Sequence, residues 1–132
     1  MLEKRFRADL IVALKEAGKE AFPIESAVTP GFPDMVVAGN VASLVELKVV
    51  PTRASKTTLH DLFEATQRAF QKRWWTTQAA GLWVAIHDEK DGEYQALALC
   101  PGLLDKTLAA LTSYGISGRS ITELVKHWRY ML

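Results

Sequence analysis

The chain has 132 residues, of which 48% are apolar and 23% are charged. This length and composition predict one soluble globular domain over residues 1–132, large enough to bury a core. A net charge of +1 does not by itself indicate nucleic-acid binding. The single cysteine, Cys100, excludes an internal disulfide and a cysteine-based zinc site.

No apolar run approaches the roughly 20 residues that a membrane span requires, so no association with a membrane is expected. Residues 1–5 begin an amphipathic helix rather than a secretion signal. With the lone cysteine, these observations favour a cytoplasmic protein.

The first part of the chain predicts one helix followed by three strands. Apolar residues recur at helical spacing over residues 2–17, and Gly18 suits the end of that helix. The elements that follow are a strand over 22–28, a rigid turn over 30–33, a strand over 34–38, a turn at 39–40, a strand over 41–50 and a loop over 51–56.

The second part predicts a long helix, a hairpin and two more helices. An apolar stripe indicates a helix over 58–75, and Asp91-Gly92 favours a two-residue type I′ turn. The remaining elements are strands over 82–87 and 93–99, a helix from Pro101 to about 114, a break over 115–118 and a helix over 120–131.

This order, α-β-β-β-α-β-β-α-α, predicts an α/β fold with a mixed central β-sheet flanked by helices. We expect a core over about residues 1–99 and a helical extension over about 101–132.

Three charged residues, Asp34, Glu46 and Lys48, stand in apolar runs that are typical of buried strands. Burying a charge costs several kcal/mol unless a partner or a metal compensates it. Two carboxylates and an ammonium are the groups needed to bind a hard divalent cation and to cut a phosphodiester. The alternative is a buried ion pair between Lys48 and a carboxylate, without catalysis.

Strand geometry brings these side chains together. Residues i and i+2 of a strand share a face, so Glu46 and Lys48 project together. A tight turn at 39–40 would lay the two strands antiparallel and let Asp34 converge with Glu46. Mg²⁺ takes oxygen ligands from one or two carboxylates and keeps waters. The Leu47 carbonyl is a plausible further ligand, and Mn²⁺ is expected to substitute.

A second, looser D-x-K occurs at Asp88-Glu89-Lys90. Because it runs directly into Asp91-Gly92, we interpret it as an exposed hairpin tip rather than a site.

Basic residues concentrate beside the proposed site. The 28 residues from Lys48 to Trp75 contain six basic and two acidic residues, as a polyanionic substrate would require. An ordinary solvated helix face is the alternative. The candidate DNA-binding residues are Arg53, Lys56, Arg68 and Lys72.

The motifs Gly31-Phe32-Pro33-Asp34 and Val45-Glu46-Leu47-Lys48, followed by a helix carrying Gln67, resemble the PD-(D/E)XK nuclease superfamily. Within it, the chain is most similar to small VRR-NUC and Holliday-junction-resolvase-like nucleases. The resemblance covers about residues 1–87 and depends on the ordered combination of motifs. The segment before Gln67 is longer than in the tightest examples, and nothing after residue 99 matches.

The resemblance implies that Asp34 and Glu46 bind metal, that Lys48 is the catalytic lysine and that Gln67 lies near the site. It also implies that a glutamate of the first helix completes the metal site, and Glu3 is the best match. Asp9 competes with Glu3, and Gln71, one turn after Gln67, competes with Gln67.

The leading interpretation is therefore a Mg²⁺-dependent DNA endonuclease acting on branched or junction DNA, a preference that comes from the resemblance. Cutting two strands of a symmetric junction needs two active sites, so a homodimer is expected. The alternatives are an inactive nucleic-acid-binding or protein-interaction module, and a nuclease for single-strand ends. Trp75 is a candidate for stacking on an unpaired base, with packing as the alternative.

Overall fold

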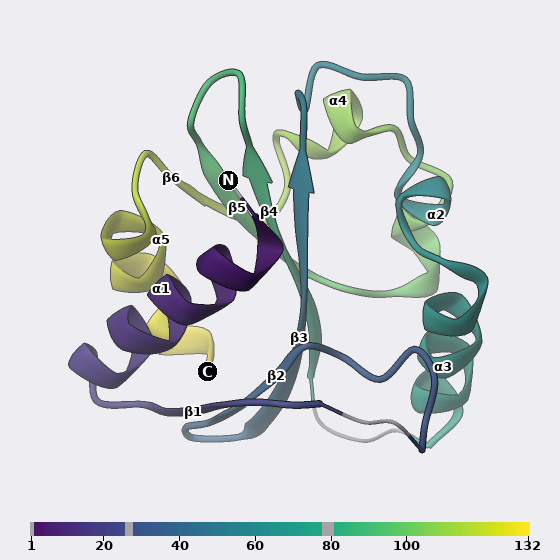
Figure 1. Cartoon of the computed structure of the whole chain (residues 1–132). Coiled ribbons are helices and arrows are strands. Elements are labelled where there is room, and N and C mark those ends of the chain that lie inside the picture. Colours follow the sequence, from purple (N-terminus) through teal and green to yellow (C-terminus); the bar gives the residue numbers. More distant parts are fainter. Residues whose placement is uncertain (1, 26–27, 78–80) are drawn as a thin grey trace.

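The computed structural model describes residues 2–25, 28–77 and 81–132, and it has the predicted mixed sheet (Figure 1). The strands lie side by side in chain order, with β3 and β4 parallel and all other neighbouring pairs antiparallel. They are β1 (Glu20–Pro23), β2 (Met35–Ala38), β3 (Ala42–Val50), β4 (Leu82–Asp88), β5 (Tyr94–Ala98) and β6 (Ile116–Gly118).

Helices cover both faces of the sheet (Figure 1). One face packs on α1 (Glu3–Glu16) and α5 (Ile121–Trp128). The other face lies under α2 (Leu59–Leu62), α3 (Ala65–Thr76) and α4 (Leu108–Leu111). Among the described residues, no helix combines the length and the apolar character needed to cross a lipid bilayer.

Strand β3 contributes to both layers because its side chains alternate. Val45 and Leu47 join the core beneath α1 and α5, whereas Leu44 and Val50 join the core beneath α3. Glu46 and Lys48 have the same parity as Leu44 and Val50, so they project between the sheet and α3.

The elements of the first half are confirmed with shifted ends. The strand predicted over 22–28 is β1, which begins at Glu20 and ends at Pro23, and residues 26–27 lie outside the described residues. Asp34 directly precedes β2.

The single helix predicted over 58–75 is wrong, because the backbone becomes extended at Phe63 and divides it into α2 and α3. Glu64 begins α3 through a capping box, in which its side chain and that of Gln67 each bond to the other's backbone N–H. Phe63 is buried, so the break turns an aromatic ring into the core.

The helix predicted from Pro101 to about 114 is also wrong. This segment forms a short 3₁₀ turn at Pro101–Leu103 and then α4. Backbone hydrogen bonds join it to the start of α2 and the residues just before it: Leu59 N donates to Lys106 O and Leu108 N donates to Thr57 O, both at 2.9 Å. These long-range bonds replace those of a continuous helix.

The predicted break at 115–118 contains β6, an edge strand paired with β5. The final helix is confirmed as α5, followed by a 3₁₀ turn at Arg129–Met131. Leu124, Val125, Trp128 and Leu132 are buried in the core with α1, so the C-terminal segment completes the domain.

The predicted β4–β5 hairpin is present, but its connection is longer than a two-residue type I′ turn. Residues 89–93 separate the strands, and the Asp88 carboxylate accepts from the N–H groups of Lys90 and Asp91. Asp88 is fully buried, so the D-x-K there begins inside the core rather than at an exposed tip.

Candidate active site

Asp34 lies where β3 extends beyond the end of β2. Its N–H donates to Val45 O at 3.1 Å, and its Oδ2 accepts from Leu47 N at 2.7 Å. The carboxylate therefore occupies the place that a longer β2 would take. Because the N–H and C=O of one strand residue point to the same edge, the Leu47 carbonyl faces Asp34 as well.

Gln67 joins Glu46 to Lys48. Its Nε2 donates to Glu46 Oε1 at 2.8 Å, and its Oε1 accepts from Lys48 Nζ at 3.0 Å. The same Oε1 accepts from Glu64 N at 2.9 Å, which is half of the capping box that begins α3. Gln71, the competing candidate, is buried, and its Oε1 has no hydrogen-bond partner among the described residues.

Glu46 is held in an environment that opposes its ionised form. Burial, and then the adjacent Asp34 carboxylate, raise the pKa of Glu46 from 4.5 to about 9, although the Lys48 ammonium acts against this. Only 4% of Glu46 is exposed. A buried carboxyl beside a second carboxylate is the environment that a bound cation would relieve.

This donor set fits a hard divalent cation. Asp34, Glu46 and the Leu47 carbonyl could supply oxygen ligands, and Mg²⁺ needs only one or two carboxylates beside its waters. The Glu3 carboxylate also helps to raise the pKa of Glu46, so the two carboxyl groups are close enough to interact electrostatically. Among the described residues, no three acidic, histidine or cysteine side chains form a preassembled metal cluster, and Glu3 stays a prediction as a metal ligand.

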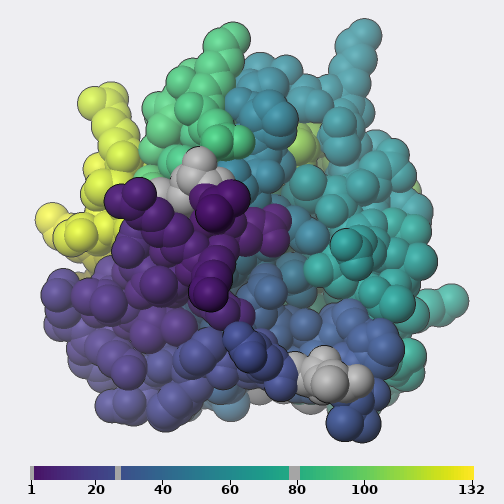
Figure 2. Space-filling model, in the orientation of Figure 1, coloured from purple at the N-terminus to yellow at the C-terminus, as the bar shows by residue number. Residues whose placement is uncertain are grey.

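A cavity of about 260 Å³ opens beside Asp34, lined also by Leu47, Glu3, Lys4, Arg7 and Glu25. Arg7 pairs with Glu25, with Nη2 3.6 Å from Oε1. In Figure 2 the N-terminal segment, in purple, borders the blue surface formed by the segment around β3. Lys4 and Arg7 were missed by the sequence analysis. Helical periodicity could have found Arg7, because it lies four residues after Glu3 on the same helix face.

Phe63 was also missed as a site residue. Its buried ring faces the ammonium of Lys48, the proposed catalytic lysine, and Lys48 Nζ lies 5.7 Å from the ring centroid. This contact is a cation–π interaction that helps hold the ammonium in place. No sequence signal identified Phe63. In the continuous helix that was predicted over 58–75, Phe63 is one of several apolar residues on the same face.

Gly31 lets the turn that carries Asp34 approach the helix that carries Gln67. Its φ is +78°, and a Cβ there would lie 2.1 Å from the Thr66 carbonyl oxygen. We predict that Gly31→Ala destabilises the protein by about 3 kcal/mol, through backbone strain and this clash. Thermal unfolding checks this against Gly102→Ala, where nothing lies within 4 Å. Equal melting temperatures for the two variants would contradict it.

The expectation that Arg53 contacts DNA is corrected by the structure. Arg53 is buried, its guanidinium bonds to Gln95 Oε1 and Glu93 Oε2, and its N–H donates to Asp88 Oδ2 at 2.9 Å. It therefore fixes the loop after β3 against the β4–β5 hairpin. Because Arg53 is buried and bonds to Asp88, Glu93 and Gln95, its guanidinium is not exposed for contact with DNA.

The other basic candidates lie nearer the solvent. Lys56 and Lys72 are exposed, and Arg68 is half-buried. Arg68 Nη1 donates to the His60 carbonyl at 3.1 Å and to the Phe63 carbonyl, which ties the end of α2 to α3. Lys56, Arg68 and Lys72 stay predictions as DNA-binding residues.

No protein-family model matches the chain, and no curated protein sequence matches it. Among solved structures, it is similar to Hjc, a Holliday junction resolvase from the archaeal hyperthermophile Archaeoglobus fulgidus. The TM-score is 0.54 with 20% sequence identity, and the match covers 72% of this chain and 75% of that chain. At this identity the likeness concerns the fold alone: over the matched part, this chain has a fold similar to that of the archaeal resolvase.

Proposed function

We propose that the protein is a divalent-metal-dependent DNA endonuclease that hydrolyses phosphodiester bonds in branched or junction DNA. Mg²⁺ is the proposed ion, with Mn²⁺ able to replace it. We further propose that the protein works as a homodimer, since two symmetric cuts need two sites. The structural neighbour's activity on Holliday junctions supports the choice of substrate.

One observation carries the proposal: Gln67 bonds to both Glu46 and Lys48, beside Asp34. A carboxylate pair, an ammonium and an amide that bridges the ammonium to one carboxyl lie together on the interior strand β3, beside the start of β2. Packing alone does not require this set, because buried charges without a function are costly.

The residues divide the chemistry between them. Asp34, Glu46 and the Leu47 carbonyl would hold the ion. When bound, the ion would polarise the scissile phosphate and lower the pKa of a coordinated water. Lys48 would stabilise the charge that develops on the phosphate, or orient the attacking water. Gln67 holds the ammonium and the Glu46 carboxyl at fixed places, which reduces reorganisation during the reaction.

The proposal is tested by incubating the protein with labelled four-way junction, flap, single-stranded and blunt duplex DNA. Each substrate is run with Mg²⁺, Mn²⁺ or EDTA. We expect cation-dependent cleavage with a preference for the branched substrates. Lys48→Ala should lower the rate by about a hundredfold or more, as the loss of one preorganised donor does in other enzymes.

Lys126→Ala is the matched control, because it removes an exposed lysine of α5. Equal cleavage by both variants would reject Lys48 as a catalytic residue. Binding of junction DNA without cleavage under any ion would favour the inactive binding module instead.

A further inference from the structure

A groove of about 540 Å³ lies on the side of α3 that faces the segment after β5. The cationic side chains that line it are Arg68 and Lys72, and His60 lines it as well. None of the described lining residues carries a carboxylate, although the exposed Asp61 carboxylate contacts His60, with Oδ1 3.3 Å from Nδ1. The Lys72 ammonium has no hydrogen bond or ion pair with the described residues. The groove therefore favours an anion.

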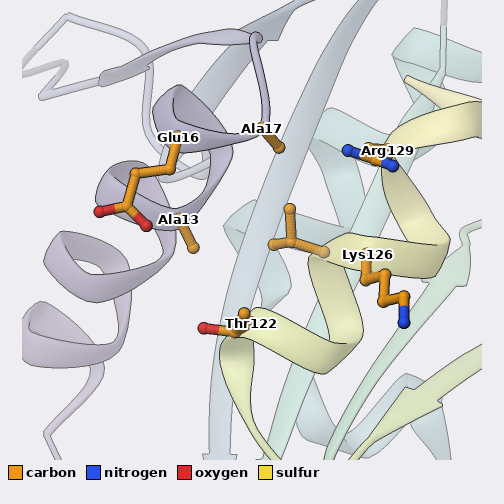
Figure 3. Close-up of a pocket in the computed structure, with 7 residues that line it drawn as sticks. Ala13, Glu16, Ala17, Thr122, Lys126 and Arg129 are labelled. Atoms are coloured by element: carbon orange, nitrogen blue, oxygen red, sulfur yellow. The ribbon is translucent and has the colours of Figure 1, made fainter.

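A second cavity does not have this excess of positive charge. The space between α1 and α5, about 230 Å³, has Glu16 on one side and Lys126 and Arg129 on the other (Figure 3). Charges of both signs line it, so it selects no sign of ligand.

The walls of the α3 groove are apolar and fixed. Trp75, Pro101 and Leu104 line it. The Trp75 indole is half-buried, and its Nε1 donates to the Leu99 carbonyl at 3.1 Å, which holds the ring in one orientation. A rigid aromatic side chain binds a flat ligand at a low cost in conformational entropy.

The groove lies next to the candidate active site. Arg68 directly follows Gln67, which contacts Glu46 and Lys48. Arg68 Nη1 also donates to the carbonyl of Phe63, whose ring lies under Lys48 Nζ. A DNA strand bound at Lys48 would therefore need to pass only around α3 to reach Arg68 and the groove.

We propose that this groove binds an unpaired nucleotide of a single-stranded DNA segment next to the cleaved phosphodiester, a role that rests on the proposed function. The base packs against Trp75, and the flanking phosphates contact Lys72 and Arg68. A paired base is stacked inside its duplex, so only an unpaired one can reach the ring. The groove volume is in the range of roughly 300–1,000 Å³ that small-molecule sites show.

Binding of a fluorescein-labelled twelve-residue oligothymidylate, followed by anisotropy in EDTA, tests the proposal. Ala69 is exposed and lines the groove, so its replacement changes the groove and not the core. We expect Ala69→Glu to weaken binding about tenfold, because it places a carboxylate beside the phosphates, and Ala69→Lys to preserve or strengthen binding.

Ala110→Glu is the matched control, since it makes the same change at an exposed alanine of α4. Trp75→Ala should weaken binding about tenfold through lost stacking, and Trp75→Phe should restore much of it. Circular dichroism establishes that each variant is folded. Equal losses for Ala69→Glu and Ala69→Lys, no loss for either, or no binding by the wild type would overturn the proposal.

The measurement separates this proposal from the nuclease. Because it is made in EDTA, oligonucleotide binding is scored without any cleavage. Cleavage of junction DNA together with an unaffected Ala69→Glu variant rejects the groove and keeps the nuclease. Binding that follows the expected pattern, in a protein that cuts nothing, supports the groove and rejects the nuclease.

Discussion

Replacing Glu46 with glutamine is expected to stabilise the metal-free protein at neutral and alkaline pH while abolishing cleavage. The folded-state pKa of Glu46 is about 9, against 4.5 for the ordinary side chain. Between these values the folded state retains a proton that the unfolded state releases, so stability falls as pH rises from 4.5 toward 9. At pH 7 the penalty is about 3 kcal/mol.

Glutamine removes this penalty because it is neutral and its Oε1 can still accept from Gln67 Nε2. In EDTA the melting temperature of Glu46→Gln should exceed that of the wild type at pH 8, and the two should converge near pH 5. Added Mg²⁺ should stabilise the wild type more than the variant, because the ion binds the folded carboxylates. Glu16→Gln, at an exposed carboxylate, is the control. Parallel pH profiles for the wild type and Glu46→Gln would contradict the expectation.

Arg53→Met is expected to cause the largest loss of stability outside the site, without specific loss of DNA affinity in the folded protein. Asp88 is 0% exposed, and the Arg53 guanidinium is its charged neighbour, with Nε 3.7 Å from Oδ2. Removing one partner of a buried pair costs about 3 kcal/mol or more. For a domain of this size, that corresponds to a melting temperature lower by about 10 °C.

Part of the stability should remain, because Asp88 still accepts backbone N–H bonds from Arg53, Lys90 and Asp91. Although burial acts to raise the pKa of Asp88, these bonds lower it overall. Arg53→Met with Asp88→Asn should recover some stability, since no buried charge is then left alone. Lys56→Met, an exposed lysine of the same loop, should change stability by less than about 0.5 kcal/mol. A stable Arg53→Met protein with weakened DNA binding would favour the original surface role.

Glu46 and Arg53 differ in how far the sequence alone predicts their surroundings. Glu46 was predicted to be buried because it interrupts an apolar strand, and the structure confirms this with 4% exposure. The sequence indicated a positive charge at Arg53 but not its location. Its acceptors lie on β4, β5 and the hairpin between them, about 40 residues later in the chain.

Local periodicity was enough to predict the mixed sheet, and it places Glu46 and Lys48 on one face of β3. The alternation of side chains along a strand is a property of the backbone, so it needs no knowledge of the rest of the chain. The G-F-P-D turn and the short 39–40 turn likewise place Asp34 at the edge of β3 by local geometry.

Only the tertiary structure decided where the helices break. At Phe63 the backbone is extended, its ring packs in the core, and Gln67 on the next helix bonds to Glu46 and Lys48. These tertiary contacts take the place of a continuous helix. The 101–114 segment and β6 behave in the same way. Each forms backbone hydrogen bonds with residues that are distant in sequence, in place of local helical ones. Helix propensity is worth only tenths of a kcal/mol per residue. Contacts between distant segments outweigh it, and those contacts cannot be read from local pattern.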